Sequence, residues 1–162
     1  MQKPRNEQER QQWVQRAAAL GREYFVERGA NCSEATLWGV LTALDLPLDE
    51  ALRRAATPFG GGIGHTRSTC GALVGAVMAL GTVVGRTDDD KARKLCAYER
   101  AARLHDAFVA EAGSEYCRDL NEQGFDWPGL KQHCSRYVEI AARLAAEAIL
   151  AIRSQGAPQG NG

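Results

Sequence analysis

The chain has 162 residues, a length that fits one domain with a full hydrophobic core. Lys plus Arg and Asp plus Glu both number 20, so the formal net charge is zero and the basic excess of a nucleic-acid-binding protein is missing. The first residues are polar and unlike a signal peptide, and the uncharged stretch 68–85 is too rich in Gly and Thr to predict a membrane span. We therefore expect a cytoplasmic protein without a nucleic-acid partner.

Helical patterns follow one another along the chain. Apolar residues recur at helical spacing from Trp13 to Tyr24 and again from Leu37 to Leu44, and no segment alternates as a strand does. We predict an all-α fold, an irregular helical bundle of about six to seven helices, with a single domain over 1–154 and a disordered tail over 155–162. The expected helices span about 6–28, 31–47, 48–56, 68–84, 87–113, a short segment around 117, and 128–153.

Local signals mark several helix ends. Asn31, with Glu34 three residues later, has the pattern of a capping box, which satisfies free backbone N–H groups at a helix start. Gly29 and Gly113 stand where a left-handed residue commonly ends a helix. Pro128 suits the first position of the last helix. These signals set the expected boundaries.

One expected helix has a face made of small residues. Gly71, Gly75 and Ala79 recur every four positions, which places them on one side of the helix. Glycine is costly to helix propensity, so we expect close packing against another helix as the compensation. Either the same chain or a second copy can supply that helix, and we expect a homodimer.

Four of the five cysteines fall near expected helix N-termini, namely Cys32, Cys70, Cys117 and Cys134. Free N–H groups and the helix dipole favour an anion there, and a thiolate is such an anion. We expect the pKa of Cys70 to be lowered, which suits a nucleophile, a redox thiol or a metal ligand. No two cysteines have the close spacing of a zinc finger or a thioredoxin motif, so the fold must assemble any shared site. The alternative is that all are small buried apolar side chains.

The remaining cysteine, Cys96, falls in the middle of the helix that Gly113 ends. Leu95, Tyr98 and Leu104 predict the apolar side of this helix, and Cys96 is expected on the opposite, polar side. We expect Cys96 to take no part in the site.

A glycine-rich loop, Phe59-Gly-Gly-Gly-Ile-Gly64, precedes Cys70. Such a loop before a helix can bind phosphate, but no strand precedes it and no Lys-Ser or Lys-Thr follows, as a P-loop requires. We interpret it as tight backbone that lets Cys70 approach a cluster, a partner or a ligand. His65 and His133 are candidate ligands or proton carriers, or only polar neighbours, and His105 is expected to be structural.

The pattern as a whole is similar to a known family. Asn31-Cys-Ser-Glu-Ala35, Phe59-Gly-Gly-Gly62 and Cys70-Gly-Ala-Leu-Val-Gly75, followed by Cys117 and Cys134, resemble the C_GCAxxG_C_C family of redox-active proteins over about residues 21–144. The resemblance implies a redox role and four family cysteines, which are Cys32, Cys70, Cys117 and Cys134 here. A related domain in split-Soret cytochromes has an iron–sulfur centre beside its haem. Because Cys-x-x-Cys-His is missing here, covalent haem does not carry over, whereas an iron–sulfur cluster can.

Three functions fit Cys32, Cys70, Cys117 and Cys134. The first is a metal or iron–sulfur site for electron transfer or sensing, since thiolates are the usual ligands of such clusters. The second is a thiol–disulfide oxidoreductase without metal, with Cys70 as the nucleophile and Cys32 as a further catalytic cysteine. The third is a structural zinc site held by four thiolates. The first two require a redox partner, which the sequence does not identify.

Overall fold

The computed structural model describes residues 4–154, and the tail expected over 155–162 lies outside the described residues. The described part contains seven α-helices and a 3-10 turn, and only one isolated β-bridge, which confirms the all-α prediction. Among these helices none is both long and apolar enough to cross a membrane. The elements are α1 (Glu7–Val26), α2 (Cys32–Ala43), α3 (Glu50–Ala56), η1 (Thr57–Phe59), α4 (Gly71–Val84), α5 (Lys91–Ala112), α6 (Cys117–Leu120) and α7 (Leu130–Ser154).

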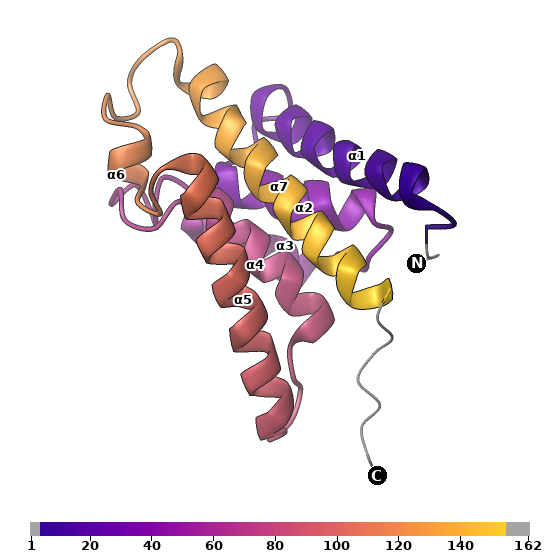
Figure 1. Cartoon of the computed structure of the whole chain (residues 1–162). Helices are drawn as coiled ribbons and strands as arrows, with labels where there is room; N and C mark the ends of the chain where they lie inside the picture. The colour runs from indigo at the N-terminus through magenta and orange to yellow at the C-terminus, as the bar shows by residue number, and fades with distance from the viewer. Residues whose placement is uncertain (1–3, 155–162) are drawn as a thin grey trace.

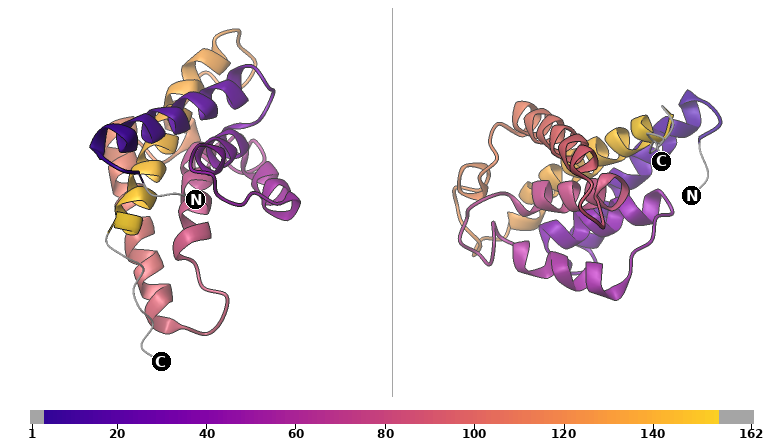
Figure 2. Two further views of the ribbon diagram at one scale, coloured as in Figure 1. Left: turned by 90° about the vertical axis from the view of Figure 1, so that its right-hand side faces the viewer. Right: turned by 90° about the horizontal axis from the view of Figure 1, so that it is seen from below.

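The last helix, α7, organises the bundle. It crosses the molecule and packs on α1, α2, α4 and α5 (Figure 1). The short α6 and the loops on either side of it lie together at one end of the bundle, beside the start of α7. At the other end, α4 and α5 project beyond the remaining helices as a hairpin (Figure 2).

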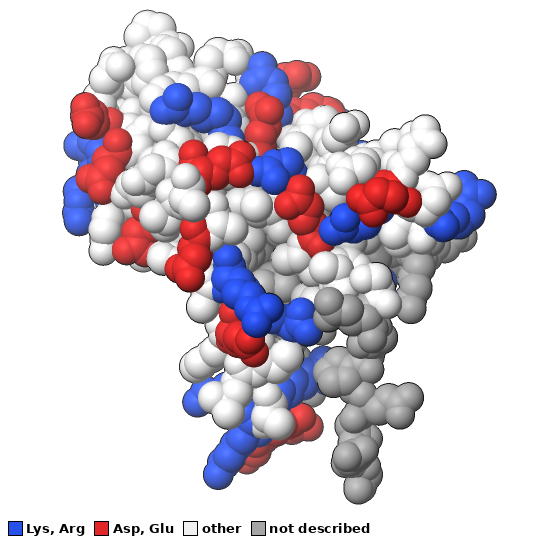
Figure 3. Space-filling view, in the orientation of Figure 1, with Lys and Arg blue, Asp and Glu red and all other residues white. Residues whose placement is uncertain are grey.

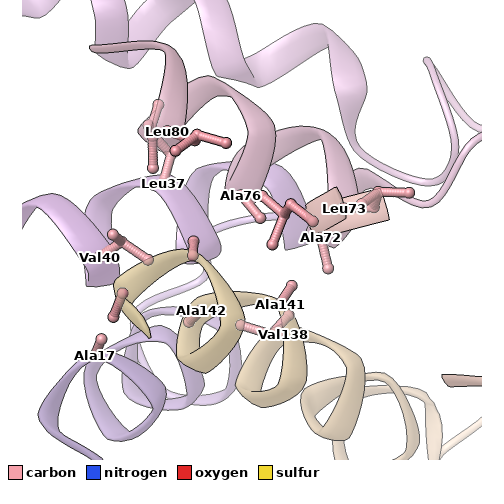
Figure 4. Close-up of a cluster of buried hydrophobic side chains, with 14 of the residues drawn as sticks. Ala17, Leu37, Val40, Ala72, Leu73, Ala76, Leu80, Val138, Ala141 and Ala142 are labelled. Carbon is pink, nitrogen blue, oxygen red and sulfur yellow. The ribbon is translucent and has the colours of Figure 1, made fainter. Parts of the chain in front are cut away.

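Small residues at the helix contacts let the backbones come close together. In the core, alanines of α7 such as Ala141 and Ala142 lie against side chains of α1, α2 and α4 (Figure 4). Where α1 and α2 meet, a Cβ atom on Gly39 would stand 2.6 Å from the backbone nitrogen of Gly21. The interior therefore depends on close approach of the backbones more than on large side chains.

The small-residue face of α4 packs inside the chain. A Cβ atom on Gly71 would stand 2.5 Å from the sulfur of Cys32, and one on Gly75 would overlap the carbonyl oxygen of Ser33. Ala79 is fully buried. Because α2 fills this face, the three residues no longer argue for a dimer.

The predicted orientation of α5 is wrong for its N-terminal half. Leu95 and Tyr98 are 67% and 64% exposed, whereas Leu104 is buried. At about 100° per residue, Leu95 and Leu104 lie on opposite sides of the helix, so a single apolar face cannot contain both. Cys96 is half-buried on the side of Leu104, and the Nε of Arg100 donates to its sulfur at 3.4 Å.

Candidate functional site

Four of the five cysteines line a single cavity of about 330 Å³. It lies at the end of the bundle where α6 and the neighbouring loops meet the starts of α2, α4 and α7 (Figure 1). The fold thus brings together side chains that are far apart in the sequence. They are Cys32, Cys70, Cys117 and Cys134.

A capping box places Cys32 at the first position of α2. The side chain of Asn31 accepts from the backbone N–H groups of Ser33 and Glu34, and the Glu34 carboxylate accepts from the N–H of Asn31. The amide of Asn31 also donates to the carbonyl of Thr57 at 2.9 Å. The predicted capping box is therefore confirmed, and it ties the Cys32 turn to the segment before the glycine-rich loop.

An antiparallel pairing of two loop segments places Cys70 beside Cys117. The N–H of Cys70 donates to the carbonyl of Glu115, and the N–H of Cys117 donates to the carbonyl of Ser68, each at 2.7 Å. Because residues 67–70 are held in this pairing, α4 begins at Gly71, later than predicted, and Cys70 is its N-cap. Cys117 is the first residue of α6.

Cys134 is the fifth residue of α7, and Lys131 precedes it by one turn. Both line the cavity. The ammonium group of Lys131 donates to the carbonyls of Phe25 and Ala30, at 2.8 and 3.2 Å, and lies 4.0 Å from the centre of the Phe25 ring. A fixed cation thus stands in the wall of the cavity beside the thiols.

Backbone of the glycine-rich loop and of the start of α4 lies next to the sulfur of Cys32. Its glycines Gly61, Gly62 and Gly64 have positive φ, and so does His65, a conformation that turns the chain tightly. The N–H groups of Gly61 and Gly71 lie near the Cys32 sulfur and favour its thiolate form. This agrees with the interpretation of the loop as tight backbone.

Burial dominates the protonation of the four thiols in the metal-free chain. It raises the pKa of Cys32, Cys70 and Cys117, and raises the pKa of Cys134 to about 12. The N–H groups of Ala72 and Leu73 oppose this at Cys70, but desolvation and the nearby Cys32 outweigh them. The expected lowering of the Cys70 pKa is therefore wrong.

The four thiols lie close enough together for a charge on one to change the pKa of the others. A charge on Cys32 raises the pKa of Cys70, of Cys117 and of Cys134. Within residues 4–154, however, no three His, Cys, Asp or Glu side chains are placed to hold one metal ion. The thiols surround a space larger than a single ion.

The histidines have three different environments. His65 lines the cavity and stacks on Phe125, with ring centres 4.3 Å apart. His133 does not line the cavity, and its Nε2 is 2.7 Å from the carbonyl oxygen of Leu120 at the end of α6. His105 contacts the carboxylates of Asp106 and Glu115 and does not line the cavity.

Cys96 lies outside the thiol cavity, as predicted. It lines a separate groove of about 490 Å³ together with Glu99, Arg100 and Arg103, which form the predicted polar side of α5, and with the apolar Leu104. Cys96 is half-buried in this groove.

Several residues of the cavity carry no motif and were not identified from the sequence. Tyr137, which is buried, donates to the carbonyl of Leu120 at 3.1 Å, and the buried Asn121 donates to Gly124 at 2.6 Å. Arg67, which does not line the cavity, donates to three carbonyls at the end of α6, and its charge lowers the pKa of Cys117 against the larger effect of burial. The position of Lys131 could have been predicted from the sequence, because a lysine one turn before Cys134 lies on the same side of the helix.

Comparison with known proteins agrees with this arrangement. A family model described as "Putative redox-active protein (C_GCAxxG_C_C)" matches residues 30–148. An uncharacterized protein of Archaeoglobus fulgidus is 26% identical over 132 residues, which cover 77% of this chain and 86% of the relative. No solved structure matches the chain. With the family model spanning all four cavity cysteines, the chain belongs to the C_GCAxxG_C_C family.

Proposed function

We propose that this protein carries an iron–sulfur cluster in the thiol cavity and uses it for electron transfer or sensing. The observation that carries the proposal is the convergence of Cys32, Cys70, Cys117 and Cys134 on one cavity. Thiolates are the usual protein ligands of such clusters, and a bound cluster supplies one-electron chemistry.

The shape of the site favours a cluster over a single zinc ion. Zinc–sulfur bonds are about 2.3 Å long, so four zinc ligands must nearly touch one another. No three suitable side chains within residues 4–154 approach that closely, while the cavity of about 330 Å³ has room for several atoms. A cluster spreads its irons over that space and accepts ligands that stand farther apart.

The protein supplies the surroundings that such a group needs. The N–H groups of Gly61 and Gly71 stabilise negative charge on the Cys32 sulfur. The positive charge of Lys131 lies near Cys32 and Cys134 and partly offsets the negative charge of their thiolates. These groups reduce the net negative charge of the site. The stacked rings of His65 and Phe125 form part of the cavity wall.

The raised thiol pKa values weigh against a metal-free thiol–disulfide oxidoreductase. Attack on a disulfide requires a thiolate, and the burial of Cys70 keeps its thiol protonated in the metal-free chain. Metal binding removes this obstacle, because the metal itself displaces the thiol protons.

Anaerobic purification with analysis of iron, zinc and acid-labile sulfide tests the proposal. We expect iron and sulfide together, visible absorbance that bleaches on reduction, and loss of both when any of Cys32, Cys70, Cys117 or Cys134 is changed to Ser. The matched control is Cys96→Ser, which should retain the cluster because Cys96 lies in a different groove. Stoichiometric zinc without sulfide would establish the structural zinc alternative, and a metal-free protein with a reversible disulfide would establish the oxidoreductase.

A further inference from the structure

The thiol cavity meets solvent where the glycine-rich loop faces the segment between α6 and α7. Among the residues that line the cavity, only His65 and Asp126 are exposed, and the others are buried or half-buried. At this side the His65 ring stacks on Phe125, with ring centres 4.3 Å apart and ring planes 22° apart. We call this pair of rings the His65–Phe125 stack.

The His65–Phe125 stack lies against the backbone next to Cys32. A Cβ atom on Gly61 would overlap Cδ2 of His65 and would stand 3.0 Å from Cζ of Phe125. The N–H group of Gly61 in turn lies near the Cys32 sulfur. From the surface inward, the order is therefore the two rings, one layer of backbone and the thiol.

The two rings are carried by backbone that is anchored on both sides. In the glycine-rich loop, the N–H of His65 donates to the carbonyl of Gly60 at 3.2 Å. On the other side, the carbonyl of Gly124, just before Phe125, accepts from the indole of Trp127 at 3.0 Å. Contact between two rings is weak compared with the packing of a helical bundle, and side chains at the surface rotate quickly. The rings can therefore part while the helices stay folded.

The surface charge around this end of the bundle is mixed. Acidic and basic side chains both lie around α6 (Figure 3), so the surface does not select ions of one sign. Cations and anions can both approach the stack.

We propose that the His65–Phe125 stack is a cover that opens by rotation of its two side chains and admits small ions to the four thiols. Parting two rings gives an opening about one side chain wide, which suits metal ions and sulfide and excludes a folded protein. The inference goes beyond the proposed cluster, because it concerns access to the thiols in the chain with or without a bound group.

Alkylation of Cys32 by iodoacetamide in the metal-free, reduced full chain tests the cover, with the rate at each cysteine followed by peptide mass. Gly61→Ala should raise the Cys32 rate about twofold to tenfold, because the methyl group displaces the rings and loss of an aromatic contact is worth that factor. The matched control is Gly64→Ala, which should leave the rate unchanged. Both glycines have positive φ, +64° and +56°, but a Cβ atom on Gly64 meets nothing within 4 Å.

A second variant, Phe125→Ala, removes one ring without strain in the glycine-rich loop. It should raise the Cys32 rate by the same factor at unchanged helix content, so the test remains decisive if Gly61→Ala does not fold. Cys96, in its separate groove, serves as the internal reference in every variant. Because global unfolding exposes every cysteine, an unchanged Cys96 rate shows that the effect is local.

Two results would overturn the proposal. One is an equal Cys32 rate in the native chain and in Phe125→Ala, which would make the stack a fixed wall and place the entrance elsewhere. The other is an equal rise in Gly64→Ala and Gly61→Ala, because strain in the loop would then be the cause and not displacement of the rings.

Discussion

Gly71 lies so close to Cys32 that a Cβ atom on it would stand 2.5 Å from the Cys32 sulfur. The same hypothetical atom would stand 2.6 Å from the carbonyl oxygen of Phe59, so a side chain at this position would overlap both a sulfur atom and the backbone. Only glycine lets the start of α4 approach the sulfur in this way. The contact couples helix packing to the proposed site.

The first prediction compares Gly71→Ala with Gly81→Ala in the same helix. Gly71→Ala should lower the free energy of unfolding by about 1–3 kcal/mol through overpacking and should reduce the iron content. At Gly81 a Cβ atom meets nothing within 4 Å, so Gly81→Ala should raise stability by about 0.4–1 kcal/mol and leave iron unchanged. Urea unfolding and iron analysis measure both effects. A Gly71→Ala protein as stable as the native one would show that the contact is not tight.

The second prediction concerns the two asparagine caps, Asn31 and Asn6. Each accepts a hydrogen bond from its helix, but Asn31 also holds the turn of Cys32 and donates to Thr57. Either change to Ala should lower stability by about 0.5–2 kcal/mol. Only Asn31→Ala should also lower the iron content, because only it moves a proposed ligand. Equal iron loss in the two variants would mean that global stability alone governs the cluster.

The third prediction is a loss of stability at alkaline pH in the metal-free, reduced chain. Burial raises the pKa of Cys134 to about 12 when the chain is folded, whereas an unfolded thiol has a pKa of about 8.5. Below about pH 8.5 both states hold the proton, and the full stability is present. Above it the unfolded chain releases the proton first, so stability should fall as the pH rises toward 12.

Urea unfolding at several pH values under strong reductant measures this effect. Cys134→Ala should make the pH dependence shallower, because it removes a buried thiol with a raised pKa. A stability that rises from pH 8 to 10 would contradict the assigned burial of the thiols.

The fourth prediction concerns Lys131, whose ammonium stands in the wall of the cavity. Lys131→Met removes a positive charge beside the thiols but keeps much of the apolar stem over Phe25. Since a cation favours the more negative, reduced form of a cluster, the variant should have a lower reduction potential. A redox titration followed in the visible spectrum measures the shift, with Arg16→Met as the control. An unchanged potential in a fully loaded protein would show that Lys131 serves the carbonyls of Phe25 and Ala30 alone.

Features that depend on neighbouring residues could be predicted from the sequence, and those that depend on burial could not. The Asn31 and Glu34 pair is close in sequence, so its capping box was predictable. The position of Cys70 near a helix start was also visible, but its desolvation comes from residues distant in the chain, and it reverses the expected pKa shift.

The error in the predicted orientation of Leu95 and Tyr98 has a different physical cause. The helix α5 has apolar residues on two sides, Leu104 inward and Leu95 outward, and periodicity gives only their relative angle. Which side meets the core is decided by α4 and α7, and no local pattern contains that information.

The order in which the chain is made has a consequence for the thiol cavity. Its walls come from the starts of α2 and α4, from α6 and from α7, so the last wall is synthesised only when α7 leaves the ribosome. Contacts between such distant segments form late, because the closure of long loops comes first. A group held by all four thiols can therefore meet its last ligand, Cys134, only after the start of α7 has been synthesised.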